Sequence, residues 1–172
     1  ALPTEPARGL LEPLSERLGA RLGEIPYGSV ATLNLAFSRE QVAHPLDGMG
    51  FVVPEIEGRM LLACSFSSSK FEGRAPEGKV LLRAFVGGAY GEAALFVSDE
   101  EMIGRVMDEL GPLLGIRGEP EAAVLSRYGS AMAQYRLGHL DRVREIDEEV
   151  GKLPGIAVAG SAYRGVGIPD CA

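Results

Sequence analysis

Residues whose side chains could do chemistry are sparse in this chain of 172 residues, which has two histidines and two cysteines. His44 stands in a polar turn beside Pro45, where an exposed loop side chain is expected. His139 follows Gly138 at the predicted start of a helix. A helix N-terminus disfavours the imidazolium ion, so a structural hydrogen bond is the expected role there. No histidine or cysteine has another at zinc-site spacing, and a metal centre is not expected.

Nucleophilic and acid–base catalysis also lack a matching pattern. The three serines at 67–69 have no glycines at the spacing of a nucleophile turn. Cys64 and Cys171 are too few for a disulfide scaffold and are expected to be reduced thiols, as in a cytosolic protein. Most acidic residues follow the faces of predicted helices, where a run of charge is usually solvated. These residues are Asp99, Glu100, Glu101, Asp141, Glu145, Asp147, Glu148 and Glu149.

A glycine-rich loop near the end of the chain is the strongest ligand signal. Residues 159–171 read AGSAYRGVGIPDC, with glycines at 160, 165 and 167. The dinucleotide fingerprint G-x-G-x-x-G would need a glycine where Asp170 stands, so that motif fails. What remains is a loop whose backbone could approach a flat ring closely, with Pro169 near the first turn of a helix. A plain junction between a strand, a loop and a helix explains the same residues.

The elements that must position these residues belong to an α+β pattern. Apolar residues are 46% and charged residues 24%, which is typical of one globular domain. Helices are predicted over 4–22, with a break at Pro13, over 99–114 after a Ser98 capping box, and over 139–150. Strands are predicted over 28–37, 50–53, 60–65, 80–86, 121–128 and 156–159, the last as a buried, parallel-type strand.

The charge balance excludes one class of partner. The chain has 17 Lys+Arg and 24 Asp+Glu, a formal net charge of −7. A nucleic-acid surface needs an excess of basic residues on one face, so nucleic acid is not an expected partner.

Six segments carry a further signal when they are taken together in their order along the chain. They are Pro26–Ala31, Gly48–Pro54, Ser68–Phe71 with Arg74–Pro76, Leu82–Gly88, Gln134–His139 and Ala159–Cys171. Together they resemble the oxygen-dependent protoporphyrinogen oxidases, FAD enzymes of haem biosynthesis within the flavin amine oxidase superfamily. The resemblance covers essentially the whole chain.

The resemblance implies an α+β fold with a mixed, largely antiparallel sheet and packed helices. It implies that residues 1–155 are part of a substrate-binding domain. Residues 156–172 would be the last strand and the flavin-contacting loop of an FAD domain. Most of the FAD site would lie in a missing part of the same enzyme. We therefore expect the chain to be a piece of a larger oxidoreductase, inactive and without bound FAD on its own.

Site residues follow from the same resemblance. The backbone of Val166, Gly167 and Ile168 matches the loop that meets the isoalloxazine ring, and Tyr128 matches an aromatic position near the flavin. Four further residues match positions that line the tetrapyrrole pocket: Met49, Val52, Ser65 and Phe85. For Met49, Val52 and Phe85, the alternative is an ordinary place in the sheet core.

The implied substrate is a porphyrinogen, either protoporphyrinogen or coproporphyrinogen, whose macrocycle suits an apolar pocket. The implied enzyme is cytoplasmic, with peripheral membrane association left open for the parent. Exposed apolar faces would favour a homo-oligomer. Two alternatives remain: another flavin amine oxidase relative, against which the Gln134–His139 segment argues, and a non-catalytic module that binds a tetrapyrrole or a protein.

Overall fold

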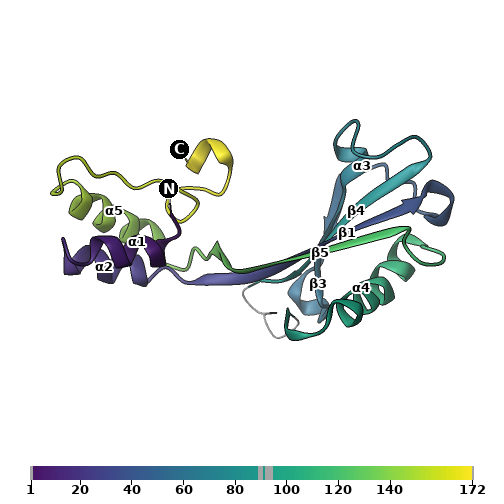
Figure 1. The fold of residues 1–172 in the computed structure, drawn as a ribbon, viewed down its shortest axis with the longest axis horizontal. Coiled ribbons are helices and arrows are strands. Elements are labelled where there is room, and N and C mark those ends of the chain that lie inside the picture. Colours follow the sequence, from purple (N-terminus) through teal and green to yellow (C-terminus); the bar gives the residue numbers. More distant parts are fainter. Residues whose placement is uncertain (1, 89–90, 92–94, 172) are drawn as a thin grey trace. The chain divides into compact units, whose positions relative to one another are not determined.

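The computed structural model describes residues 2–88, 91 and 95–171 of the chain (Figure 1). Its helices and strands, in chain order, are α1 (Thr4–Leu11), α2 (Glu16–Gly23), β1 (Tyr27–Ser38), β2 (Gly50–Val52), β3 (Leu61–Phe66), α3 (Ser67–Lys70), β4 (Lys79–Gly87), α4 (Asp99–Leu114), β5 (Ala122–Ala133) and α5 (His139–Val150). The chain divides into two compact units, a helical unit of residues 1–28 and 130–172 and a sheet unit of residues 29–129.

The sheet unit is built on five strands in the order β2-β3-β4-β1-β5. β1 pairs antiparallel with β4, β4 with β3, and β3 with β2. The alternating sequence of β1 explains its place, because every second side chain is fully buried and those between them face the other way. The buried residues are Ala31, Leu33, Leu35 and Phe37. The predicted α+β fold with a largely antiparallel sheet is confirmed.

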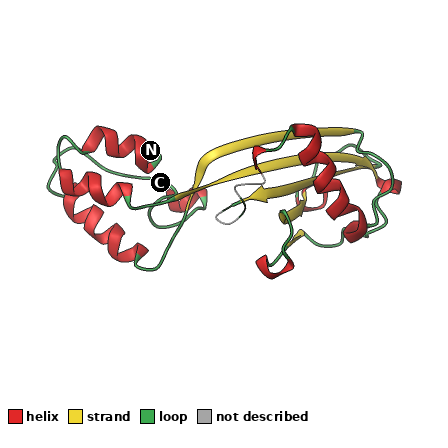
Figure 2. Cartoon of the chain, turned by 90° about the horizontal axis from the view of Figure 1, so that it is seen from below, coloured by secondary structure: helices red, strands yellow, loops and turns green. Residues whose placement is uncertain are grey.

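Helix α4 covers one face of this sheet (Figure 2). It begins after Ser98, whose hydroxyl accepts a hydrogen bond from the Glu101 amide at 3.2 Å, as the predicted capping residue should. Two residues predicted on its inner face, Ile103 and Met107, are only half-buried, because they lie one position beyond the buried stripe. Residues spaced by four form that stripe: Met102, Val106, Leu110 and Leu114.

The helical unit packs α1 and α2 with α5. The predicted break at Pro13 is confirmed, since α1 ends before it and α2 begins after Ser15. The Ser15 hydroxyl accepts a hydrogen bond from the Leu18 amide at 3.2 Å, which caps α2. The core of the unit joins α2 to the predicted inner face of α5, through Leu18, Leu22, Val143, Ile146 and Val150.

Three local predictions were wrong. Residues 156–159 do not form a buried strand: among the described residues no strand pairs with them, so their apolar side chains stay half-buried or exposed. β5 continues to Ala133, beyond the predicted end at 128. His44 is not an exposed loop residue, because its Nδ1 atom accepts a hydrogen bond from the Leu46 amide at 3.0 Å and its ring lies 5.4 Å from that of Phe66.

The division into two compact units does not test the predicted domain boundary between residues 155 and 156, which stays a prediction. Over residues 2–88, 91 and 95–171, no helix combines the length and apolar character needed to cross a membrane.

Candidate functional site

A shallow hollow on the sheet brings together the four residues predicted to line a substrate pocket. Met49 precedes β2, Val52 ends it, and Ser65 and Phe85 belong to β3 and β4; all four border one space of about 240 Å³. Met49 is 70% exposed and Val52 is 79% exposed, so neither lies in the sheet core. The other lining residues are Gly50, Phe51, Ala63, Cys64 and Lys70.

The strand register explains why these side chains share a face. Val52 lies opposite Ala63, and Ala63 lies opposite Phe85. Residues directly opposite each other on paired strands point to the same side of the sheet. Cys64 and Ala84 point to the other side and are buried in the core that α4 closes. Burial raises the pKa of the Cys64 thiol to about 12, so a Cys64 thiolate nucleophile is not available.

The hollow is apolar with a positively charged border. Lys70 is the one charged residue in its lining, although the chain carries 24 acidic residues. The Lys70 ammonium lies 5.4 Å from the centre of the Phe71 ring, and the Arg74 guanidinium lies 5.3 Å from the same ring. Such a surface suits a large apolar ligand that bears acidic groups.

Tyr128 lies on the face of the sheet that carries the hollow. Leu125, three residues earlier in β5, packs against the core that α4 closes. Strand residues an odd number apart point to opposite faces, so Tyr128 points away from α4. Its side chain is 48% exposed and open to a ligand on that face.

The glycine loop, in the helical unit, is wound tightly around one carboxylate. A Cβ atom at Gly165 would lie 2.6 Å from the Cβ of Asp170, and one at Gly167 would lie 2.8 Å from its Oδ2. The Asp170 amide donates a hydrogen bond to the Gly167 carbonyl at 2.9 Å. Val166 and Ile168 are 74% and 89% exposed, so the outer side of the loop is open. Glycine is required here for close packing of the loop on itself.

A stacked pair of rings holds the first part of this loop. The rings of Tyr135 and His139 lie 4.0 Å apart and within 13° of parallel. The Tyr135 hydroxyl donates to the Ser161 carbonyl at 2.6 Å, and His139 Nε2 lies 2.8 Å from the Tyr163 carbonyl. Because a carbonyl only accepts, Nε2 carries the proton. The structural role expected for His139 is confirmed, whereas the role of Tyr135 was missed; its place one turn before His139 was the available signal.

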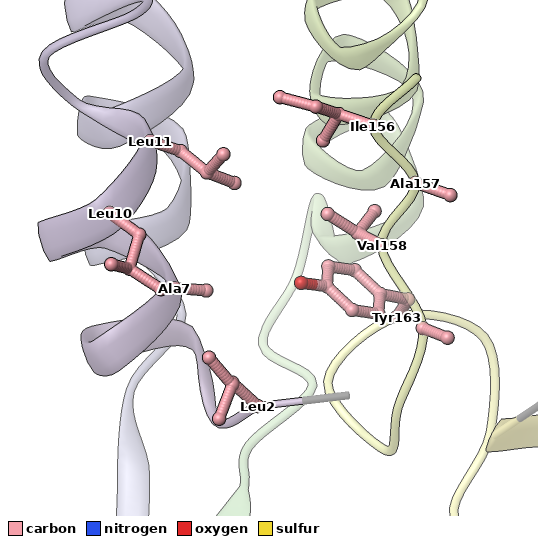
Figure 3. Close-up of a pocket in the computed structure, with 9 residues that line it drawn as sticks. Leu2, Ala7, Leu10, Leu11, Ile156, Ala157, Val158 and Tyr163 are labelled. Carbon is pink, nitrogen blue, oxygen red and sulfur yellow. The ribbon is translucent and has the colours of Figure 1, made fainter.

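A second pocket, also missed by sequence reasoning, lies within the helical unit (Figure 3). Its volume is about 240 Å³, and α1 contributes Ala7, Leu10 and Leu11 to one side. The extended residues 156–159 and Tyr163 form the opposite side. Burial raises the pKa of the Tyr163 hydroxyl to about 12. The pocket is therefore apolar and carries no group that is ionised near neutral pH.

The described part of the chain offers no cluster for acid–base or metal chemistry. Within it, no three His, Cys, Asp or Glu side chains come together as a set of metal ligands. Several acids of the helical unit are used in ion pairs: Glu145 binds Arg21 at 2.7 Å, and Glu24 binds Arg142 at 3.0 Å. The Arg142 hydrogen bond is the main reason that the pKa of Glu24 is lowered. The described residues can position a ligand.

Comparison with known proteins supplies the family. Residues 2–172 match the flavin containing amine oxidoreductases. The chain belongs to this family. It is 38% identical over 144 residues to coproporphyrinogen III oxidase of Bacillus subtilis (strain 168), which covers 83% of this chain and 31% of that protein. It is 31% identical over 150 residues to protoporphyrinogen oxidase 2 of Arabidopsis thaliana, which covers 86% of this chain and 30% of that protein.

Two solved structures agree with the fold. A crystal structure from Exiguobacterium sp. 255-15, described as a candidate protoporphyrinogen oxidase, superimposes with a TM-score of 0.83 at 34% identity. It covers 99% of this chain, and this chain covers 37% of it. Reduced UDP-galactopyranose mutase, at 12% identity and a TM-score of 0.58, shares the fold alone. The chain thus spans about 31% of the length of the curated relatives named above.

Proposed function

We propose that this chain is the substrate-facing part of an FAD-dependent porphyrinogen oxidase of haem biosynthesis. The observation that carries the proposal is the hollow on the sheet. Met49, Val52, Ser65 and Phe85 line it together, in a setting that is apolar and borders Lys70. A porphyrinogen combines an apolar macrocycle with carboxylate side chains, and both features suit this surface. The names of the relatives at 38% and 31% identity support the same reading.

The glycine loop fits a flavin through its backbone. Gly165 and Gly167 leave no side chain where Asp170 packs, and the exposed residues beside them keep the outer side of the loop accessible. In this proposal the backbone of Val166, Gly167 and Ile168 would hold a flavin ring. Tyr128, in the sheet unit, is proposed separately as an aromatic residue for flavin contact. A bound flavin would supply the redox chemistry, the transfer of hydride equivalents from the macrocycle and of electrons to oxygen. In this proposal the chain binds the porphyrinogen, orients it and excludes water from it.

Coproporphyrinogen is the better candidate of the two substrates. Three relatives named coproporphyrinogen III oxidase are 38%, 33% and 36% identical to the chain. Relatives named protoporphyrinogen oxidase are 31%, 32% and 27% identical. We therefore infer that the parent oxidises coproporphyrinogen faster than protoporphyrinogen, and parallel assays with the two substrates test this inference.

The proposal includes the arrangement of the parent enzyme. Residues 1–155 are part of its substrate-binding domain, and residues 156–172, whose described part forms an extended segment and a loop here, belong to its FAD domain. The parent is cytoplasmic, and fractionation of cells separates a free protein from one held peripherally on membranes. The apolar pocket of the helical unit, where Leu10 is 65% exposed, favours association into a homo-oligomer. Light scattering tests this, and a monomer would contradict it.

The decisive experiment measures oxygen uptake by the full-length parent with coproporphyrinogen or protoporphyrinogen. We expect bound FAD and enzyme-dependent porphyrin formation above the spontaneous rate. The 172-residue chain alone should be colourless and inactive. A parent that binds flavin but oxidises only amines or carotenoids would support the other flavin amine oxidase reading. A parent without flavin that binds a tetrapyrrole would support the non-catalytic module.

A matched pair of variants tests whether the hollow takes the substrate. Val52→Asp places a negative charge in the hollow, and Ile56→Asp places the same charge at a site that is 93% exposed outside it. A like charge about 4 Å away costs roughly 1–4 kcal/mol near a surface, so we expect Val52→Asp to raise KM for the acidic substrate about tenfold. Ile56→Asp should leave KM unchanged. Equal effects of the two variants would refute the assignment of the hollow.

A further inference from the structure

The cationic side chain of Arg83 lies on the same face of the sheet as the hollow, directly across from the lining residue Ser65. Gly50 lies opposite Ser65, Ser65 opposite Arg83, and Arg83 opposite Asn34. These residues therefore form one row across β2, β3, β4 and β1, with their side chains on one face. The neighbouring row contains Phe85, which lines the hollow. The Arg83 side chain thus lies beside two lining residues, Ser65 across the strand pair and Phe85 along the strand.

Arg83 is oriented but not neutralised. Its Nε–H donates to Asn34 Oδ1 at 2.8 Å. That bond uses one of the five N–H donors of a guanidinium and leaves the terminal groups for another partner. Arg83 is half-buried, and the ion pairs within the described part of the sheet unit use Lys79, Arg105 and Arg127 instead. A fixed, half-buried guanidinium without a carboxylate suits bidentate binding of an acidic ligand group.

The surroundings favour a carboxylate over other acceptors. The lining of the hollow contains Lys70 and no acidic residue. Lys70 and Arg83 both belong to elements next to Ser65, since α3 follows β3 directly and β4 pairs with it. An apolar surface bordered by two cations matches an apolar ring that carries carboxylate arms.

We propose that Arg83, positioned by Asn34 and assisted by Lys70, binds a carboxylate of the tetrapyrrole that occupies the hollow. The proposal rests on the proposed function and adds a specificity-determining site to it. The terminal N–H groups of Arg83 bind the carboxylate, while Met49, Val52 and Phe85 contact the ring.

The test compares binding of coproporphyrin III with binding of its methyl ester to the full-length parent, by porphyrin fluorescence. The ester keeps the ring and removes the charges. A hydrogen bond to a charged group corresponds to about a tenfold change in Kd or more. We expect Arg83→Gln to weaken binding of the acid about tenfold and to leave binding of the ester unchanged. Arg83→Lys keeps the charge without the planar fork, and should give a smaller loss for the acid only.

Arg105→Gln is the matched control, because it removes one positive charge from α4, on the opposite face of the sheet. It should change neither Kd. The proposal is overturned if Arg83→Gln and Arg83→Lys weaken the acid and the ester equally, since that result indicates a packing role. It is also overturned if the ratio of the two Kd values stays at the wild-type value. These binding ratios do not depend on oxygen uptake, so failure of this proposal and failure of the oxidase assignment are distinguishable.

Discussion

Gly50 controls whether the edge strand β2 stays on the sheet, and its replacement by alanine should release that strand. Gly50 has φ +137°, a conformation that side chains rarely adopt. A Cβ atom there would lie 2.1 Å from the Cys64 carbonyl oxygen and 2.8 Å from the Ser65 Cα atom. Both contacts are to backbone of β3, so no side-chain rotation relieves them. The pairing between β2 and β3 must yield.

The size of the effect follows from what holds β2. Backbone strain of this kind costs about 1–3 kcal/mol before the clash is counted. The strand is held beside Gly50 by the Phe66 amide bound to the Met49 carbonyl at 3.0 Å and the Val53 amide bound to the Leu62 carbonyl at 2.8 Å. Each such bond contributes about 1 kcal/mol. The strain is therefore comparable to the energy that holds the strand, so β2 detaches locally and the rest of the sheet remains folded.

Hydrogen exchange measures this directly. A local loss of about 3 kcal/mol should speed exchange of the Val53 and Phe66 amides roughly 100-fold in the Gly50→Ala chain. Amides of the β1–β4 pair should keep their protection. Gly48→Ala is the control, because its φ is not positive and no atom lies within 4 Å of an added Cβ. Unchanged exchange at Val53 and Phe66, or equal loss over the whole sheet, would refute the reasoning.

Three further predictions concern the buried groups. Iodoacetamide should label Cys171 and spare Cys64 in the native chain, because Cys64 is 1% exposed and burial raises the pKa of its thiol to about 12; equal labelling would contradict this. Ile146→Ala should lower the free energy of unfolding by about 2–5 kcal/mol in chemical denaturation, whereas Leu137→Ala, at a fully exposed position, should change it by less than about 0.5 kcal/mol. Burial raises the pKa of Tyr163 from 10.0 to about 12, so the unfolded state releases this proton first and stability falls as pH rises from 10 to 12. Tyr163→Phe should reduce that alkaline loss, and an identical pH profile would refute the assignment.

Sequence periodicity predicts the elements well where one face alone is buried. β1 alternates and α4 repeats every third or fourth residue, because each meets one core and solvent on its other side. The same logic failed for residues 156–159. Their apolar side chains resemble those of a buried strand, but strand formation depends on a partner strand, and among the described residues none pairs with them. The residues of a segment do not by themselves show whether a partner strand is available to it.

The sequence likewise predicted one part of the candidate site and missed another. The resemblance named Met49, Val52, Ser65 and Phe85, and the structure brings them to one hollow. The place of Arg83 could not be read from the same pattern. Alternation alone says that it shares a face with Phe85, but its contact with Asn34 depends on the register between β1 and β4, which is a long-range property.

The charge of the chain makes this local arrangement necessary for an acidic substrate. A formal net charge of −7 repels a tetrapyrrole carboxylate at long range. Salt screens that repulsion beyond about 10 Å, so short-range groups decide the binding. Lys70 in the lining and Arg83 in the row of Ser65 are two cations on the ligand-facing side for which the described part of the sheet unit provides no ion pair. Added salt should therefore weaken binding of the acid in the wild type more than in Arg83→Gln, and an equal salt dependence would argue that the attraction lies elsewhere.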